Sequence, residues 1–114
     1  MFCKHYKSYL KEREGLEVID HKYGFLAWRM FERNGDKIGF INDYWVMPEQ
    51  RRKGLGFKLA DQAILKMKKK GAKLVMCQSD ERANAHDLSR KTILNFGFKE
   101  IEREGPIIHY VLEV

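Results

Sequence analysis

The stretch that decides the fold is WVMPEQRRKGLGFKLADQAI, residues 45–64. An apolar run ends at Pro48, a basic segment with Gly54 and Gly56 follows, and apolar residues then recur every three to four positions. Proline cannot donate a hydrogen bond to a sheet, and a repeat of three to four residues is typical of a helix. The stretch therefore predicts a strand, a short loop and a helix in immediate succession.

This junction has the features of an anion site. Where a strand runs through a loop directly into a helix, several free backbone N–H groups point toward one place, next to the positive end of the helix dipole. Gly54 and Gly56 permit positive φ or a close approach to the backbone, and Arg51 and Lys53 add positive charge at the rim. On this pattern alone, a solvated basic loop remains the alternative, because many strand–helix connections contain glycines and cations.

The rest of the chain predicts one domain, residues 1–114, of the α/β (α+β) class. The expected architecture is a mixed, mostly antiparallel central sheet of about six strands flanked by helices. Asn34-Gly35 predicts a tight hairpin turn, and Gly15, Gly71 and Gly97 are expected to end helices. The expected order is helix 2–13, strands 16–20, 24–32 and 37–47, helix 55–70, strand 73–78, helix 86–96, and strands 98–103 and 107–113.

The charge of the chain lies in one segment. The formal net charge is +6, and residues 47–72 hold eight basic and two acidic residues, which accounts for the whole excess. The last four of these cations are Lys66, Lys68, Lys69 and Lys70, and cations in the last turn offset the negative end of a helix. A nucleic-acid-binding domain is an alternative, but the interleaved aromatic residues of a single-strand binder are missing, so nucleic acid is an unlikely partner.

Two further classes receive no support from the composition. Cys3 and Cys77 lack the spacing of a zinc site, so no metal is expected. No apolar run approaches the roughly 20 residues that span a bilayer, and the first residues lack the apolar core of a signal peptide. We therefore expect a cytoplasmic protein without a membrane partner.

Residues 45–64 resemble motif A of the GNAT superfamily, the acyl-CoA-dependent N-acyltransferases. The usual form of this motif is V-x-P-x-x-R/Q-x-x-G-x-G/A at a strand–loop–helix junction. All five of its defining positions are matched here, by Val46, Pro48, Arg51, Gly54 and Gly56.

A second segment, ILNFGFKEIE at residues 93–102, is similar to the family's helix that ends in Gly-Phe, with Gly97 and Phe98 in register. The resemblance covers about residues 15–113. It implies a GNAT-like fold, acetyl-CoA as co-substrate and transfer of its acetyl group to an amine.

The resemblance also implies which residues hold acetyl-CoA. The backbone of Tyr44, Trp45 and Val46 is expected to bond the pantetheine arm, and Lys53 and Lys58 are expected near the 3′-phosphate. The amides expected to hold the pyrophosphate are those of Arg51, Arg52, Lys53, Gly54, Leu55 and Gly56.

Acetyl transfer to an amine also requires a general base and a general acid. A lysine-like amine, with a pKa of about 10.4, is less than about 0.1% neutral near pH 7, so a base is needed. Asp43 is the first candidate, with Glu17 and Asp20 acting through water as weaker ones. Where this chain has Ile93, many family members have a tyrosine that acts as the general acid and protonates the departing CoA sulfur. The groups expected to replace it as the acid are Tyr44, Cys77, His86 and Tyr110.

Ile93 also keeps open a second interpretation, a catalytically silent CoA-binding module. Only about 14 residues precede the first expected strand, so the helices that normally wall the acceptor pocket of this family have no room. A pocket without that wall suits an amine exposed on a protein, or a wall supplied by a second subunit in a homodimer.

Overall fold

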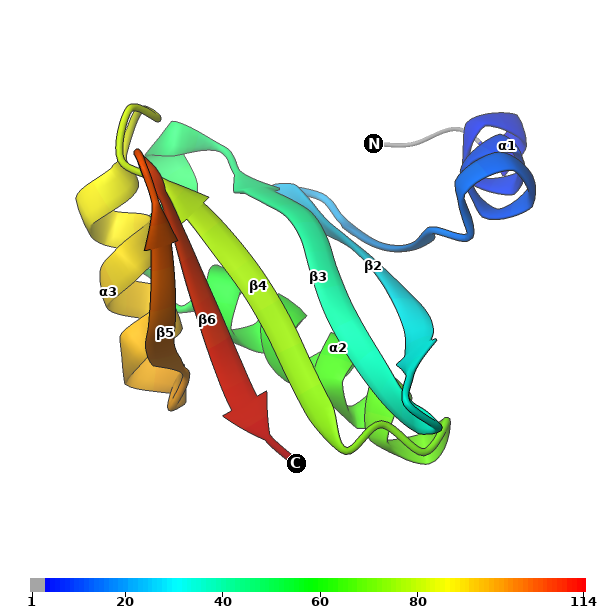
Figure 1. Cartoon of the computed structure of the whole chain (residues 1–114). Coiled ribbons are helices and arrows are strands. Elements are labelled where there is room, and N and C mark those ends of the chain that lie inside the picture. The colour runs from blue at the N-terminus through cyan, green and yellow to red at the C-terminus, as the bar shows by residue number, and fades with distance from the viewer. Residues whose placement is uncertain (1–3) are drawn as a thin grey trace.

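The computed structural model describes residues 4–114, so Cys3 and the start of the predicted first helix lie outside the described part (Figure 1). Six strands form one sheet in the order β1-β2-β3-β4-β6-β5. The helices are α1 (Lys4–Glu14), α2 (Leu55–Lys69) and α3 (His86–Phe96), with a short 3-10 turn, η1 (Pro48–Gln50). The strands are β1 (Glu17–His21), β2 (Gly24–Arg33), β3 (Asp36–Val46), β4 (Leu74–Asp80), β5 (Lys99–Glu104) and β6 (Ile107–Glu113).

Every neighbouring pair of strands is antiparallel except β3 and β4, which are parallel and joined by the crossover helix α2. The turn between β2 and β3 has positive φ at Asn34 (53°) and Gly35 (83°), as a type I′ hairpin turn requires. The predicted hairpin, the order of elements and the mostly antiparallel six-stranded sheet are therefore confirmed.

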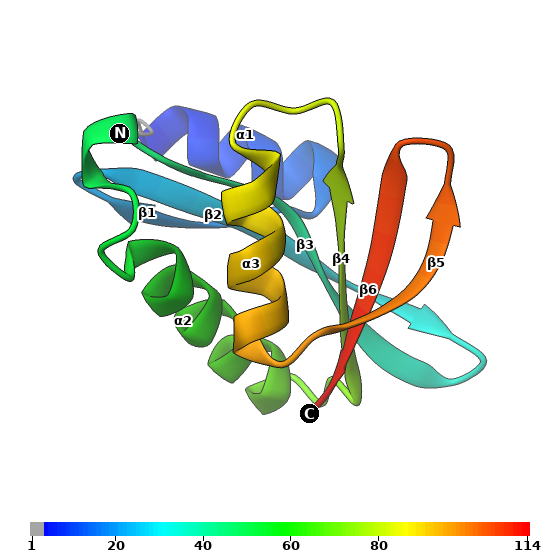
Figure 2. The same ribbon diagram turned by 90° about the vertical axis from the view of Figure 1, so that its left-hand side faces the viewer.

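The parallel pair β3–β4 is short, and this creates the space for a site. Pairing extends only from Ile38 opposite Leu74 to Phe40 opposite Met76, and beyond it the carboxyl ends of the two strands diverge (Figure 2). Just after this point Asn42 is a β-bulge, because Ile41 pairs with Trp28 while Asp43 pairs with the adjacent Ala27. A bulge bends its strand and increases its twist, which here accompanies the separation of β3 from β4.

The main core lies between the sheet and the helices α2 and α3. Leu59, Ala63 and Met67 of α2 are almost fully buried, and Gly39 of β3 allows the close contact with Met67: a Cβ at Gly39 would lie 2.4 Å from the Met67 sulfur. Tyr110 of β6 is also fully buried in this core. Burial of these side chains fixes α2, and with it the loop at the amino end of α2, relative to β3.

The opposite face of the sheet is covered only at one end. Leu10 and Leu16 pack with Ala27 in a small separate cluster beneath α1. Figure 1 shows α1 beside β2, with the near face of β4, β5 and β6 free of any helix of residues 4–114. No helix in this part of the chain is long and apolar enough to span a membrane.

Two local differences from the sequence prediction bear on function. The turn η1 was not expected; it forms at Pro48, whose fixed φ suits the first position of a helical turn. The fourth strand was expected to end at Gln78, but β4 continues through Ser79 and Asp80 because they pair with Ile108 and Ile107 of β6. The extension places Ser79 inside the protein, at 9% exposure.

Candidate active site

A groove of about 680 Å³ lies between the amino end of α2 and the amino-terminal half of α3. Of the residues predicted to hold acetyl-CoA, those that line this groove are Tyr44, Trp45, Val46, Arg51, Arg52, Gly54, Leu55 and Gly56. Lys53 and Lys58 do not line it, and the Lys53 ammonium lies 3.5 Å from the Gln50 side-chain oxygen. The opposite wall, residues 83–95, contributes Lys91, a cation that the sequence analysis did not select.

The loop exposes backbone donors to this groove. Arg52 (φ 64°) and Gly54 (φ 84°) have left-handed conformations, and the first backbone bond of α2 runs from the Lys58 N–H to the Gly54 carbonyl at 3.1 Å. The N–H groups of residues 55–57 therefore have no backbone acceptor within the described chain. Gly56 does not have a positive φ, contrary to one of its two predicted roles; it is a helical residue whose missing side chain leaves the groove open.

Arg51 has a structural role that the motif alone did not indicate. Its Nε donates a hydrogen bond of 2.9 Å to the Val46 carbonyl, which ties the loop back to the end of β3. This bond engages one of the two lone pairs of the Val46 carbonyl and leaves the other for a ligand. Arg51 also lines the groove, and its planar guanidinium has further N–H groups that can donate to a ligand.

The free edge of β3 presents other backbone groups. The Met47 N–H donates to the Tyr23 carbonyl at 2.8 Å, and hydrogen-bonded pairs alternate along an antiparallel ladder. Trp45 therefore bonds to β2, whereas the backbone groups of Tyr44 and Val46 point to the other edge, from which β4 has diverged. Of the three residues predicted to bond the pantetheine arm, Tyr44 and Val46 therefore direct their backbone groups into the gap between β3 and β4, and Trp45 does not.

A second cavity, of about 210 Å³, occupies the gap between β3 and β4. On the core side its lining includes Tyr44 and Phe96, and on the other side it reaches Asp43, which pairs across the strands with the α1-facing Ala27. Tyr44 lines both this cavity and the groove, so the two spaces meet at its ring. Ile93 also lines the cavity. The position at which many family members have the tyrosine that acts as general acid therefore lies at this cavity.

The two predicted catalytic residues differ in their environment. Partial burial raises the pKa of the Asp43 carboxyl, and the Tyr44 backbone N–H opposes this shift in part. Burial likewise raises the pKa of the Tyr44 hydroxyl, against a hydrogen bond from the Ser89 side chain. Tyr44 therefore stays protonated at neutral pH. The weaker candidates Glu17 and Asp20 form ion pairs with Lys11 (3.1 Å) and Lys7 (3.4 Å) of α1.

The groups expected to replace the tyrosine differ in how readily they can exchange a proton near neutral pH. Cys77 lines the cavity, but burial raises the pKa of its thiol to about 12, so it is a poor proton exchanger near neutral pH. His86 lines the cavity, and its Nε2 lies 3.2 Å from the Ser79 hydroxyl. Ser79 also contacts the Tyr110 hydroxyl at 2.8 Å. The sequence offered no signal for Ser79, because its partners lie 7 and 31 residues away.

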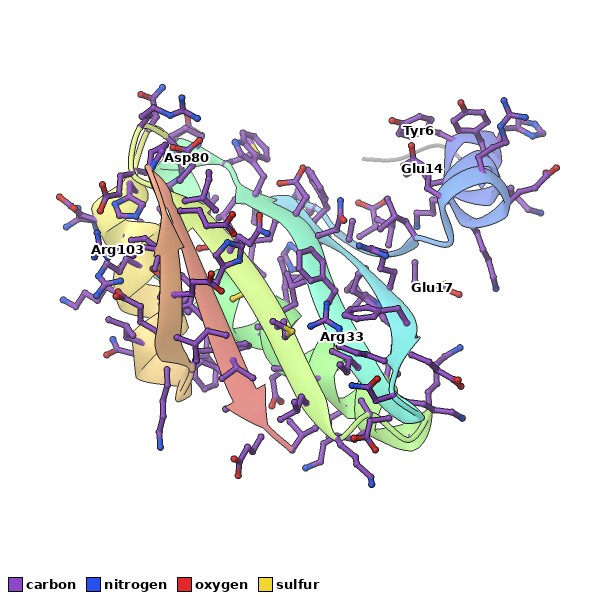
Figure 3. The ribbon with its side chains drawn as sticks, viewed as in Figure 1. Tyr6, Glu14, Glu17, Arg33, Asp80 and Arg103 are labelled. Carbon is purple, nitrogen blue, oxygen red and sulfur yellow. The ribbon has the colours of Figure 1, made fainter. Side chains whose placement is uncertain are left out.

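Two carboxylates line this cavity, and one of them, Asp80, is paired with Arg82 at 2.9 Å. Figure 3 shows Asp80 at the carboxyl end of β4, next to the loop that leads to α3. Hydrogen bonds from Arg82 lower the pKa of the Asp80 carboxyl to about 2, so Asp80 is ionised at neutral pH. Asp43 lines the same cavity from β3. No group of three or more metal-ligating side chains occurs in residues 4–114.

Comparison with protein-family models gives one match, the acetyltransferase (GNAT) family, over residues 4–93, more than three quarters of the chain. The chain belongs to the GNAT acetyltransferase family. The match confirms the resemblance predicted from motif A. No curated protein sequence matches the chain significantly.

Solved structures share this fold at low sequence identity. The NatC complex bound to a Gag peptide and CoA contains a chain with a TM-score of 0.76 and 20% identity, over 100% of this chain and 81% of that one. A GNAT-family protein from Desulfovibrio desulfuricans has a TM-score of 0.69 and 17% identity over 83% of this chain, and the present chain spans 64% of its length. Arabidopsis thaliana NAA60, in complex with acetyl-CoA, has a TM-score of 0.64 and 10% identity over 81% and 66% of the two chains.

Proposed function

We propose that this chain transfers the acetyl group of acetyl-CoA to a primary amine exposed on a protein. The observation that supports this most is the junction of the two spaces at Tyr44. The groove with free amides at the start of α2 suits the phosphates of CoA, and the narrower cavity between β3 and β4 suits the thioester. An extended pantetheine arm would connect them along the Tyr44 and Val46 backbone groups that face the gap.

The phosphates would meet donors from two helices. The N–H groups of residues 55–57 would bind the pyrophosphate, and Arg51, Arg52 and Lys91 line the same groove against one carboxylate, Asp87. Lys53 and Lys58 would contribute only from outside the groove, at the 3′-phosphate. The cationic end of the groove offsets the negative charge of the cofactor.

The acceptor would approach from the open face of the sheet. The cavity reaches Asp43, Gln78 and Asp80, and the face beyond β4 carries no helix among the described residues. Asp43 would attract a protonated amine and take its proton or pass it to water, whereas the charge of Asp80 is balanced by Arg82. Among structures of this fold, the NatC complex holds a peptide together with CoA. In a homodimer, a second copy of the chain beside this face would supply the missing wall of the acceptor pocket.

A silent CoA-binding module is the second candidate, and Ile93 is the observation that favours it. A nucleic-acid role is weaker: the lysines in the last turn of α2 lie about 20 Å along the helix from the basic loop, so the charge is not one continuous patch.

Thermal unfolding tests the cofactor site. At acetyl-CoA concentrations about 100 times Kd, binding to the native state adds roughly 2.7 kcal/mol. The absence of any Tm shift at millimolar acetyl-CoA would refute both candidates. Dephospho-CoA should bind more weakly if Lys53 or Lys58 contacts the 3′-phosphate.

Transfer itself is tested with [14C]acetyl-CoA and three probes: a peptide with a free amino terminus, an amino-terminally blocked peptide with one lysine, and spermidine. Labelling of either peptide in preference to spermidine supports a protein acceptor. Labelling of spermidine alone would refute it, and tight binding without labelling or thioester hydrolysis would favour the silent module.

A further inference from the structure

Ile93 occupies the position at which many family members have a tyrosine as general acid. Its side chain is buried, lines the cavity and has no exchangeable proton. In the proposed reaction the departing sulfur therefore leaves as the thiolate, at a cost in rate near pH 7, unless a different group protonates it. Ser79 is the polar side chain at this cavity that is buried and also connected to other buried polar groups.

The hydrogen bonds around Ser79 form a connected chain from Arg90 to His86. Arg90 donates to the Tyr110 hydroxyl at 2.9 Å and to Glu100 at 2.9 Å, and a guanidinium can only donate. The Tyr110 hydroxyl accepts from Arg90 and lies 2.8 Å from Ser79 Oγ, and either of these two oxygens can be the donor. When Tyr110 donates, Ser79 Oγ accepts, and the Ser79 proton is free for His86 Nε2, at 3.2 Å, in the tautomer with its proton on Nδ1, or for a molecule in the cavity.

We infer that Ser79 and His86 form a proton-transfer pair that replaces the missing tyrosine, with Tyr110 and Arg90 as positioning residues. This inference rests on the proposed acetyl transfer. The structure brings the pair together from β4 and the start of α3, and both side chains line the cavity, whereas Tyr110 is fully buried and acts through Ser79.

The proton balance closes within the pair. As the acceptor nitrogen bonds to the acetyl carbon, it gives one proton to Ser79 Oγ while the Ser79 proton passes to His86 Nε2. As the carbon–sulfur bond breaks with its electron pair on sulfur, Ser79 Oγ gives a proton to the sulfur and recovers one from His86. The products are the amide and the CoA thiol, and the pair returns to its starting state. The Tyr110 hydrogen bond stabilises negative charge on Oγ during both transfers.

Other ionisable groups surround the pair and would shape its pH response. They are Asp80 on β4, Asp87 and Arg90 on α3, Tyr110 on β6, and Asp43, Tyr44 and Cys77 across or beside the cavity. Asp87 lies 3.9 Å from His86 Nδ1, on the side of the imidazole away from Ser79. A negative charge there favours a proton on Nδ1 and leaves Nε2 free to accept.

The size of the effect follows from the leaving group. A thiol with a pKa of about 8.5 leaves as thiolate at a penalty of about 30-fold near pH 7, and that penalty vanishes above about pH 9. Ser79→Ala should therefore lower kcat about 30-fold at pH 7, with the loss narrowing as pH rises. His86→Gln, which keeps a hydrogen-bonding partner for Ser79 but cannot carry the proton, should show the same narrowing loss. Tyr110→Phe should cost about threefold to tenfold.

The assay is CoA thiol release from acetyl-CoA, with poly-L-lysine or water as acceptor, between pH 6.5 and 9.5. Calorimetric Kd values for acetyl-CoA should change by less than twofold in Ser79→Ala and His86→Gln, and Ser8→Ala on the exposed surface of α1 is the matched control. Losses below threefold in both variants, or losses equal at every pH, would overturn the inference. Failure of the wild-type chain to bind acetyl-CoA would overturn the proposed function first, and the inference with it.

Discussion

Two substitutions at Gly56, to alanine and to valine, should separate the stability of this chain from its function. A Cβ at Gly56 would lie 3.6 Å from the Tyr44 ring and 3.8 Å from the Thr92 methyl group, both ordinary contacts, and the residue has no positive φ. Alanine in place of glycine in a helix stabilises by up to about 1 kcal/mol. With an unfolding entropy of about 0.24 kcal/mol/K for 114 residues, Tm should rise by up to about 4 °C.

Gly56→Val, in contrast, should weaken acetyl-CoA binding, whereas Gly56→Ala should bind nearly as the wild type does, because the motif accepts alanine at this position. The branched valine side chain would project into the groove where the N–H groups of residues 55–57 have no backbone acceptor. Loss of one charge-assisted bond to a phosphate costs about 1.5–3 kcal/mol, which raises Kd roughly tenfold to a hundredfold. Thermal melts without ligand and calorimetry with acetyl-CoA measure the two effects separately.

Gly54→Ala is the control for the stability effect. Gly54 has a φ of 84° with no neighbour within 4 Å of its would-be Cβ, so alanine there meets backbone strain rather than a clash and should lower Tm. A Gly56→Val protein that binds acetyl-CoA as tightly as the wild type would show that the amino end of α2 is not the phosphate site.

Arg51→Lys keeps the charge but loses the planar Nε donor to Val46, so acetyl-CoA Kd should rise about threefold to tenfold in calorimetry, and an unchanged Kd would argue against a shaping role for this bond. Burial raises the pKa of the Asp43 carboxyl above its ordinary value of 3.8. The ionised carboxylate therefore lowers the free energy of unfolding at pH values above the raised pKa, and has no such effect below pH 3.8, where Asp43 is protonated in both the folded and the unfolded chain. Asp43→Asn should therefore raise Tm at pH 7 but not at pH 3, and should lower kcat if Asp43 is the base; unchanged turnover would leave it a strand carboxylate. Because burial raises the pKa of Cys77 to about 12, its peptide should stay unmodified by iodoacetamide at pH 8 until denaturant is added, as peptide mapping would show. Ile93→Tyr should raise kcat by up to about a hundredfold, and more in a Ser79→Ala background than in the wild type, provided the ring fits the cavity; equal gains would mean that Ser79 is not the acid.

The parts of the site that could be predicted from the sequence are those carried by neighbouring residues. Pro48, Gly54 and the apolar period after Leu55 specify the strand, loop and helix locally, and these are the features that the GNAT motif also uses. The role of Arg51 could not be predicted, although it lies in the same motif. Its hydrogen bond to Val46 depends on how the turn η1 folds the chain back.

The sequence by itself determined the order of elements, the hairpin at Asn34-Gly35 and the strand–loop–helix junction at residues 45–64, because turn, capping and periodicity signals act over a few residues. Only the tertiary structure decided where β3 leaves β4, since this depends on the bulge at Asn42 and on packing across the sheet. It also decided that Ser79 meets Tyr110, 31 residues away, and that Ile93 faces the same cavity. Burial and strand pairing between distant segments create these contacts, and no local pattern encodes them.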